Sequence, residues 1–319
     1  MKTTKIYHAI LPAFSFLICL ICLQGCFARM KKLTITDLPG TFKAGEIISA
    51  KKGCTISFEE LMSDLNSVRI IYIGEKHTDP VHHTIQLKLI KALYKKNHDM
   101  TVGMEAFDSS YHKILDQWTA GGLDEKSFIE KSHWYANWRF DFKLYSGILD
   151  FLKEKHIKLV GLNIPFYIPP RIAVGGINNL SDLEKEYLPK KIDTSNSAHR
   201  EYVEKIFSHH HIKGRENFEN FYEAQCVWED AMAEAVAGSL KDNTIMVVIV
   251  GNGHIKEKFG VPNRAFERSK APFRTIFLAP AGSKVKLTCA DYIWVTGKKE
   301  DQRKGLVTKN KKREHKSYE

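Results

Sequence analysis

The sequence predicts an α/β fold: a parallel β-sheet flanked by helices in three layers (α/β/α), with a helical cap insertion. Short, nearly continuous apolar runs, which are typical of strands buried on both faces, alternate with segments of helical periodicity. Several of the runs end in glycine followed by polar residues. Because an alternation of strand and helix requires right-handed crossovers, the strands are expected to be parallel.

The first predicted strand is Val68–Ile73, and a helix follows it. Asp79-Pro80 supplies an N-cap and a first-turn proline for this helix. A second helix is expected at Phe140–Lys155, with apolar residues on one face. The other predicted strands are Met100–Met104, Ile157–Leu162, Thr244–Val250 and Phe273–Leu278.

Residues 181–240 lie between the third and fourth strands and are mostly helical in pattern. The segment is too long for a plain crossover, so we expect a helical cap over one end of the sheet. Its longest helix is predicted at Asn217–Leu240, where Gln225 and Glu229 are polar members of a packing stripe. The folded domain is predicted to span residues 58–297.

The N-terminus predicts export. Two lysines precede the apolar run Ile6–Leu23, and Leu23-Gln24-Gly25-Cys26 resembles a bacterial lipobox. We therefore expect a signal peptide at residues 1–25, lipidation of Cys26 and a tether at residues 26–57 with at most a short hairpin. An uncleaved anchor helix is the alternative. Phe27, rather than aspartate, follows the cysteine, which favours the outer membrane of the cell envelope by resemblance to sorted lipoproteins.

The net charge of +11 does not indicate nucleic-acid binding, because the signal segment and the tail carry most of it. The tail, residues 298–319, has a net charge of +5 and no periodicity, so it is predicted to be disordered. Cys54, Cys226 and Cys289 remain after export, an odd number at wide spacing. They predict no disulfide framework or zinc site and are expected to be buried, although export permits one disulfide.

Polar residues follow the carboxyl ends of four predicted strands. Because parallel sheets bind ligands beyond these ends, the side chains are expected to converge on one pocket. Taken singly, each is more often structural, but their coincidence at one edge favours a site. The residues are Glu75, His77, Glu105, Asn163, Asn252 and His254.

These motifs resemble the ChaN family of haem-binding, iron-regulated lipoproteins. The resemblance rests on Gly74-Glu75-x-His77, His82-His83, Gly103-Met104-Glu105-Ala106-Phe107, Leu162-Asn163-x-Pro165, Ala224-Gln225, Asp230-x-Met232-Ala233 and Gly251-Asn252-Gly253-His254. It implies a homodimer that encloses two ferric haems. A tyrosine from one subunit would ligate each iron, and a histidine and a lysine from the other would bind the propionates. Erythromycin-esterase-like and TIKI-like hydrolases share the Gly-x-x-His core more distantly.

Tyr167 is the candidate iron ligand, because Pro165, Pro169 and Pro170 hold its segment rigid beside the predicted pocket. Phenolate is a hard donor that suits ferric iron. Arg171 could contact a propionate. The resemblance also places Gln225 at the site. Further tyrosines stay open as ligands, namely Tyr111, Tyr202 and Tyr222, whereas Tyr145 is expected in the core.

Other suggestive residues receive structural interpretations. His209, His210 and His211 point about 100° apart on a helix and cannot all bind one ion. A solvated helix end is therefore expected, with contact to a haem propionate across a dimer as the alternative. His82 and His83 are as compatible with a surface role as with the pocket. The aromatic segment Trp134–Trp138 is expected to pack in the core, with a ligand wall as the alternative.

Three functions remain compatible with the sequence. The first is haem binding for iron acquisition, without catalysis, and we expect a binding protein rather than an enzyme. The second is a metal-dependent or metal-free hydrolase that uses Glu75, His77, Glu105 and His254. The third is a tethered interaction module in which these groups only organise the sheet edge.

Overall fold

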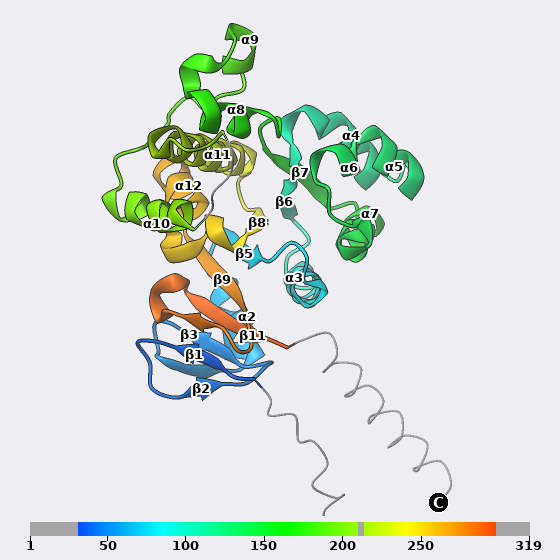
Figure 1. Ribbon diagram of the computed structural model, residues 1–319. Helices are drawn as coiled ribbons and strands as arrows, with labels where there is room; N and C mark the ends of the chain where they lie inside the picture. The colour runs from blue at the N-terminus through cyan, green and yellow to red at the C-terminus, as the bar shows by residue number, and fades with distance from the viewer. Residues whose placement is uncertain (1–30, 210–213, 298–319) are drawn as a thin grey trace, which may run out of the picture.

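The computed structural model describes residues 31–209 and 214–297, and its centre is an eight-stranded sheet (Figure 1). The strand order is β4-β3-β11-β9-β5-β8-β6-β7, and the last six strands in this order are mutually parallel. These six are β5 (Ile70–Glu75), β6 (Met100–Asp108), β7 (Lys158–Asn163), β8 (Ile245–Gly251), β9 (Phe273–Pro280) and β11 (Tyr292–Thr296). All five predicted strands are therefore present, and the α/β fold class is confirmed.

Both faces of the sheet are covered, which explains the continuous apolar runs. On β5, Ile71 and Ile73 join one hydrophobic core, while Ile70 and Tyr72 join a second core on the opposite face. Helices that contribute to the first core include α2 (Phe58–Leu65), α3 (Pro80–Tyr94), α4 (His112–Thr119), α5 (Glu125–Lys131), α6 (Trp134–Asn137) and α7 (Ser146–Glu154). The second core contains residues of α11 (Phe218–Ser239) and α12 (Val261–Ser269).

The predicted helix starts are correct where capping chemistry defines them. Asp79 accepts a hydrogen bond from the backbone N–H of Val81, and Pro80 occupies the first turn of α3. The helix expected from Phe140 begins later. Its first part is a 3₁₀ turn at Phe142–Leu144, and α7 starts only at Ser146.

The insertion between β7 and β8 is helical, as expected, but its longest helix does not cap the end of the sheet. Met232, Ala233 and Val236 of α11 pack against the sheet face in the second core. The helices α8 (Ile168–Gly175), α9 (Asp182–Lys185) and α10 (Ser197–Ser208) precede it. Of these, α8 and α10 contact α11, and Figure 1 shows this group gathered at one end of the molecule.

The expectation of a tether at residues 26–57 is wrong for residues 33–56, which form four short strands. The strands β3 (Ile47–Ser49) and β4 (Cys54–Ile56) extend the main sheet, while β1 (Leu33–Ile35) and β2 (Thr41–Phe42) form a second sheet with β10 (Lys284–Val285). Leu33 and Ile48 are fully buried. Runs of two or three residues are too short to show a strand period, so the sequence did not predict them.

The expected signal peptide, Cys26 and the basic tail lie outside the described residues. Within the described part, no helix is both long and apolar enough to cross a membrane. Cys54, Cys226 and Cys289 are all free thiols. Cys226 and Cys289 are buried, as predicted, but Cys54 is exposed at the edge strand β4.

Candidate functional site

The sheet brings the predicted polar residues together, because β5, β8, β6 and β7 are consecutive neighbours. Glu105 lies inside β6, which continues beyond its predicted end at Met104 to Asp108. The pairing of β6 with β7 shifts register between Met104 and Asp108, which marks an irregularity beside the site. The absence of a side chain at Gly161 of β7 permits this register shift, because a Cβ at Gly161 would lie only 2.5 Å from the carbonyl oxygen of Asp108.

Glu75 is the centre of one half of the cluster. Its carboxylate accepts hydrogen bonds from the Tyr145 hydroxyl at 2.5 Å and the Gln86 amide at 2.7 Å. It also lies 2.8 Å from Nδ1 of His77 and 3.4 Å from Nδ1 of His83. Burial opposes the charged carboxylate, but the hydrogen bonds and charges of the two histidines outweigh burial and hold the pKa of Glu75 well below its ordinary value.

Glu105 and His254 form the other half. Glu105 accepts a hydrogen bond from the backbone N–H of Gly251 at 2.6 Å and faces Nε2 of His254 at 3.5 Å. Nδ1 of His254 lies 3.2 Å from the carboxylate of Glu229 on α11. Burial disfavours the imidazolium, but Glu105 and Glu229 outweigh it and raise the pKa of His254 to about 10. The same pairings lower the pKa of both carboxylates against burial.

His77 is the member of the cluster that reaches solvent, with 27% of its side chain exposed, whereas Glu75 and Glu105 are buried. Its ring lies against Gly251, where a Cβ would approach Nε2 to 3.2 Å. Trp138 packs edge-on against it at a centroid distance of 4.7 Å. Burial opposes its charge, but Glu105 and Glu75 raise the pKa of His77. His77 can therefore hold or transfer a proton at the surface of an otherwise dry cluster.

The remaining predicted site residues have more structural roles. Asn163 donates from Nδ2 to the Glu105 carbonyl at 3.1 Å, and Gln225 donates to Glu229 at 2.7 Å. Asn252 does not join the cluster, because its amide donates to the Leu278 carbonyl and packs over Gly74. The missed cluster members are Gln86 on α3, Glu229 on α11 and Tyr145, which directly precedes α7. No strand-end motif marks any of them.

The histidines outside the strand ends also have definite places. His82 is fully buried and accepts from the Lys76 backbone N–H at 2.9 Å, so the surface interpretation is wrong for it. His83 is buried as well, with Nε2 bonded to the His77 carbonyl at 3.0 Å. His209 ends α10 as an exposed residue, while His210 and His211 lie outside the described residues.

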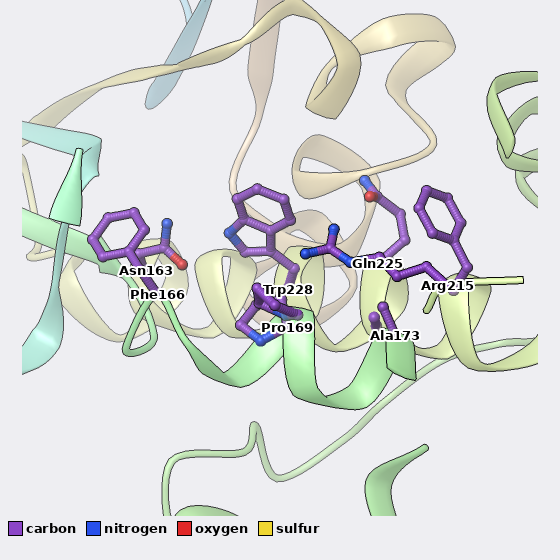
Figure 2. Close-up of a pocket in the computed structure, with 10 residues that line it drawn as sticks. Asn163, Phe166, Pro169, Ala173, Arg215, Gln225 and Trp228 are labelled. Atoms are coloured by element: carbon purple, nitrogen blue, oxygen red, sulfur yellow. The ribbon is translucent and has the colours of Figure 1, made fainter. Parts of the chain in front are cut away.

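A partly open pocket of about 210 Å³ lies beside the cluster, between α8 and α11 (Figure 2). Its walls are mainly apolar, and its polar groups come from Asn163, Gln225 and Arg215. Trp228 joins it to the cluster, because its ring lies 4.9 Å from that of His254. Arg215 was missed, since an isolated arginine in a polar loop carries no sequence signal. The apolar lining residues are Phe166, Pro169, Pro170, Ala173, Phe221, Ala224 and Trp228.

Tyr167 immediately precedes α8 and is 51% exposed. Slight desolvation of its accessible hydroxyl, together with the influence of Tyr187 and Glu184, raises the pKa of Tyr167. Its ring does not line the pocket, although its neighbours Phe166 and Pro169 do. The guanidinium of Arg171 pairs with Glu184 at 2.9 Å, so this arginine is already engaged.

The rival tyrosines are less accessible. Tyr222 is buried, and its hydroxyl contacts backbone carbonyls of the loop before α10. The Tyr111 hydroxyl is bonded to His133 and Asn137. Tyr145 is fully buried, as expected, but it also belongs to the polar cluster. Burial raises the pKa of Tyr202 to about 12.

Among the described residues, no group of three or more His, Cys, Asp or Glu side chains is arranged to hold a metal ion. A family profile described as haem-binding uptake, Tiki superfamily, ChaN matches residues 61–265, which is more than half of the chain. The chain belongs to the ChaN family. The resemblance seen in the motifs is therefore confirmed, and the family is one of haem-binding proteins.

One solved structure has the same fold as this chain. The ChaN protein of Campylobacter jejuni, solved with cofacial haem binding, is 19% identical with a TM-score of 0.63 and covers 78% of this chain and 95% of its own. An erythromycin esterase in its open conformation is 14% identical (TM-score 0.45; 73% of this chain and 77% of that one). A Bacillus cereus protein is 12% identical (TM-score 0.42; 70% of each chain). No curated protein sequence matches the chain.

Proposed function

We propose that this ChaN-family protein is a lipid-anchored envelope protein that binds ferric haem in a homodimeric pocket and serves haem or iron acquisition. The observation that supports the proposal most directly is the accessible phenol of Tyr167. It stands at the start of α8, next to an apolar pocket, in a chain that belongs to a haem-binding family.

The donor set fits haem. A ferric porphyrin presents an iron that prefers a hard anionic ligand, and a phenolate provides one. Because the pKa of Tyr167 is raised, its hydroxyl is protonated at neutral pH in the absence of a metal. The bound haem iron would therefore have to stabilise the phenolate. Tyr167 would hold the iron, and the apolar side chains around α8 would contact the macrocycle.

Exposed apolar side chains support the homodimer. Four of the five large hydrophobic residues exposed in the described part of the chain fall between residues 167 and 187. Apolar residues gathered on a protein surface often mark an interaction site. The pocket itself, at about 210 Å³, is smaller than the ~300–1,000 Å³ of sites that enclose a whole ligand. A second copy would complete the enclosure. The four residues are Tyr167, Val174, Leu183 and Tyr187.

The test is a hemin titration of the non-lipidated mature chain, followed by visible absorption and by light scattering. We expect a high-spin ferric spectrum with tyrosinate character, and a mass that doubles as haem is added. Tyr167→Phe keeps the ring and removes the ligand, so it should abolish this spectrum without changing the unfolding midpoint. Tyr135→Phe is the matched control, because Tyr135 is 54% exposed and lies on α6. An unchanged spectrum in Tyr167→Phe would refute the assignment.

A hydrolase is the second candidate, because haem ligation through a surface tyrosine leaves the buried Glu/His cluster unexplained. His77 is oriented by Glu75 and partly exposed, as a general base would be. Glu105→Gln removes a carboxylate but keeps its shape. If the protein is a haem carrier, Glu105→Gln should keep the hemin spectrum of the parent. The hydrolase is favoured if the parent forms no defined hemin complex and Glu105→Gln loses an ester- or peptide-cleaving activity.

A further inference from the structure

The small sheet of β2, β1 and β10 is apolar on one face and basic on the other. Leu33 and Ile35 of β1, Phe42 of β2 and Val285 of β10 pack in one hydrophobic core beneath the sheet. Because successive side chains of a strand point to opposite faces, the residues that alternate with these four lie on the outer face. This outer face, here called the basic face, consists of Lys32, Thr34, Thr36, Thr41, Lys43, Lys284 and Lys286.

The strand register places these residues side by side. Thr34 is paired with Lys284 on one side and with Thr41 on the other. The backbone N–H of Gly282 donates to the Lys32 carbonyl at 3.0 Å, so the pairing of the two strands continues one residue before β1. The face therefore holds four lysines and three threonines, and none of its members is acidic or a large apolar residue.

The charges of the basic face have no counter-charge in the described part of the chain. All four lysines are exposed. The two carboxylates that flank the face in sequence are engaged by backbone, because Asp37 accepts from the Leu287 N–H at 2.6 Å and Glu46 from the Lys43 N–H at 2.7 Å. The lysines that form ion pairs within the described residues are others, namely Lys52, Lys155, Lys185, Lys205, Lys258 and Lys270.

A hollow of about 380 Å³ adjoins the β10 side of the basic face, and α10 forms its opposite wall. Lys284 and Lys286 line it together with Lys256, whose ammonium lies over the ring of Tyr202 at 5.0 Å. The hollow has two carboxylates, but Glu201 is paired with Lys205 at 2.7 Å, so Glu257 is left to face three lysines. An anionic headgroup with a phosphate would therefore find an excess of positive charge beside the face as well as on it.

The position of the face in the chain indicates what covers it. Six residues separate Lys32 from Cys26, and a fully extended chain of this length spans at most about 20 Å. If Cys26 carries the lipid of the proposed function, the basic face is held at the bilayer. Figure 1 shows β1 and β2 at the end of the molecule opposite α8 and α9. A second copy does not suit the face, because two such faces would repel each other.

We propose that the basic face docks on the surface of an anionic phospholipid bilayer. The lysines would contact lipid phosphates, and the pocket between α8 and α11 would then be directed away from the membrane. The choice of a bilayer as occupant rests on the proposed anchor, whereas the charge and flatness of the face do not. Docking would fix the orientation of a protein that the lipid alone leaves free to tumble at the surface.

The test uses the non-lipidated mature chain, tail included, so that binding does not depend on the anchor. The chain is sedimented with vesicles of phosphatidylglycerol and phosphatidylethanolamine, and separately with vesicles of zwitterionic phosphatidylcholine. We expect binding to the anionic vesicles alone, and we expect it to weaken as salt is added. Each lysine near an anionic surface contributes roughly fivefold, so replacing Lys32, Lys284 and Lys286 together by Gln should weaken the partition about 100-fold.

The matched control replaces Lys113, Lys126 and Lys131 by Gln. These lysines are exposed on α4 and α5, so the net charge falls equally while the basic face stays intact. The control should change the partition by less than about threefold, and neither triple variant should change the urea unfolding midpoint. The proposal is overturned if the parent does not bind anionic vesicles, or if the control weakens binding as much as the face variant.

The basic tail is the other source of positive charge. Replacing Lys309, Lys311 and Lys312 by Gln tests it, and a loss that follows these residues while the face variant binds like the parent would also refute the docking face. The proposed function fails separately, because the fatty-acid label on Cys26 and the hemin spectrum of Tyr167→Phe are measured without reference to vesicle binding.

Discussion

Glu229 is the residue whose replacement should test the buried charges most sharply. It is fully buried on α11, and its carboxylate faces His254 at 3.2 Å, His199 at 3.1 Å and Arg264 at 3.5 Å. Glu229→Gln keeps the shape and removes the charge, so three cationic or titratable donors lose their common anion. Breaking a buried pair by removing one partner typically costs about 3–5 kcal/mol. We expect a loss of this size in the free energy of unfolding.

Urea unfolding monitored by circular dichroism measures this loss. With a slope of about 3 kcal/mol per molar urea, the midpoint should fall by roughly 1 M or more, with no change in the slope itself. Glu267→Gln is the matched control, because Glu267 pairs with Lys270 while 65% of its side chain is exposed, and such pairs contribute about 0.2–1 kcal/mol. The reasoning is refuted if Glu229→Gln costs no more than the control.

The pH dependence gives a second readout of the same substitution. The pKa of His254 is raised to about 10 in the folded protein, above its value near ~6.5 in the unfolded chain. Its contribution to the free energy of unfolding is therefore complete below pH ~6.5 and is lost as the pH rises toward 10. The pKa of Glu229 is lowered, so its contribution is present above its unfolded value and is lost only in acid. The parent should therefore lose stability between about pH 6.5 and 10. In Glu229→Gln this alkaline slope should shrink but persist, because Glu105 still faces His254.

Two further predictions concern the backbone and the anchor. Gly161→Ala should destabilise the protein by about 1–3 kcal/mol, because the new Cβ would lie 2.5 Å from the carbonyl oxygen of Asp108. Gly238→Ala on α11 is the control, because its new Cβ would have open space around it. In the same urea assay this control should be neutral or stabilising by up to ~1 kcal/mol. Cys26→Ala should abolish labelling by a radioactive fatty acid and release the chain from the membrane fraction; a labelled variant would show that the proposed lipobox is not used.

The fold was predictable to the extent that its strands are buried on both faces. Val247 and Val248 on β8 point into opposite cores, so the sequence shows an unbroken apolar run that needs no tertiary information to interpret. The edge strands lacked this signal. Ile48 is fully buried but stands in a three-residue strand, which pairs with β11 almost 250 residues later. Such pairing is fixed by the assembled sheet and not by any local period.

The candidate site was predictable in its strand-end residues and not in their partners. Glu75 and Glu105 follow apolar runs, and parallel topology then brings them together. The Tyr145 hydroxyl reaches Glu75 from 70 residues away, and the helical spacing of Tyr145 indicated only core packing. The two arginines show the same limit, because only the three-dimensional structure reveals that Arg171 is paired and that Arg215 lines the pocket.

The chemistry of the cluster favours a rigid platform over a general base. Glu105 has one oxygen bonded to the Gly251 N–H and the other facing His254, and its pKa is lowered, so it is a weak proton acceptor. Within the cluster, Glu75 faces His77, while Glu105 and Glu229 both face His254, and these pairings limit the cost of burying the carboxylates. His77 alone combines exposure with an orienting carboxylate. His77 is therefore the member of the cluster best placed to exchange a proton with a ligand, while Gln225 and Trp228 connect the platform to the neighbouring pocket.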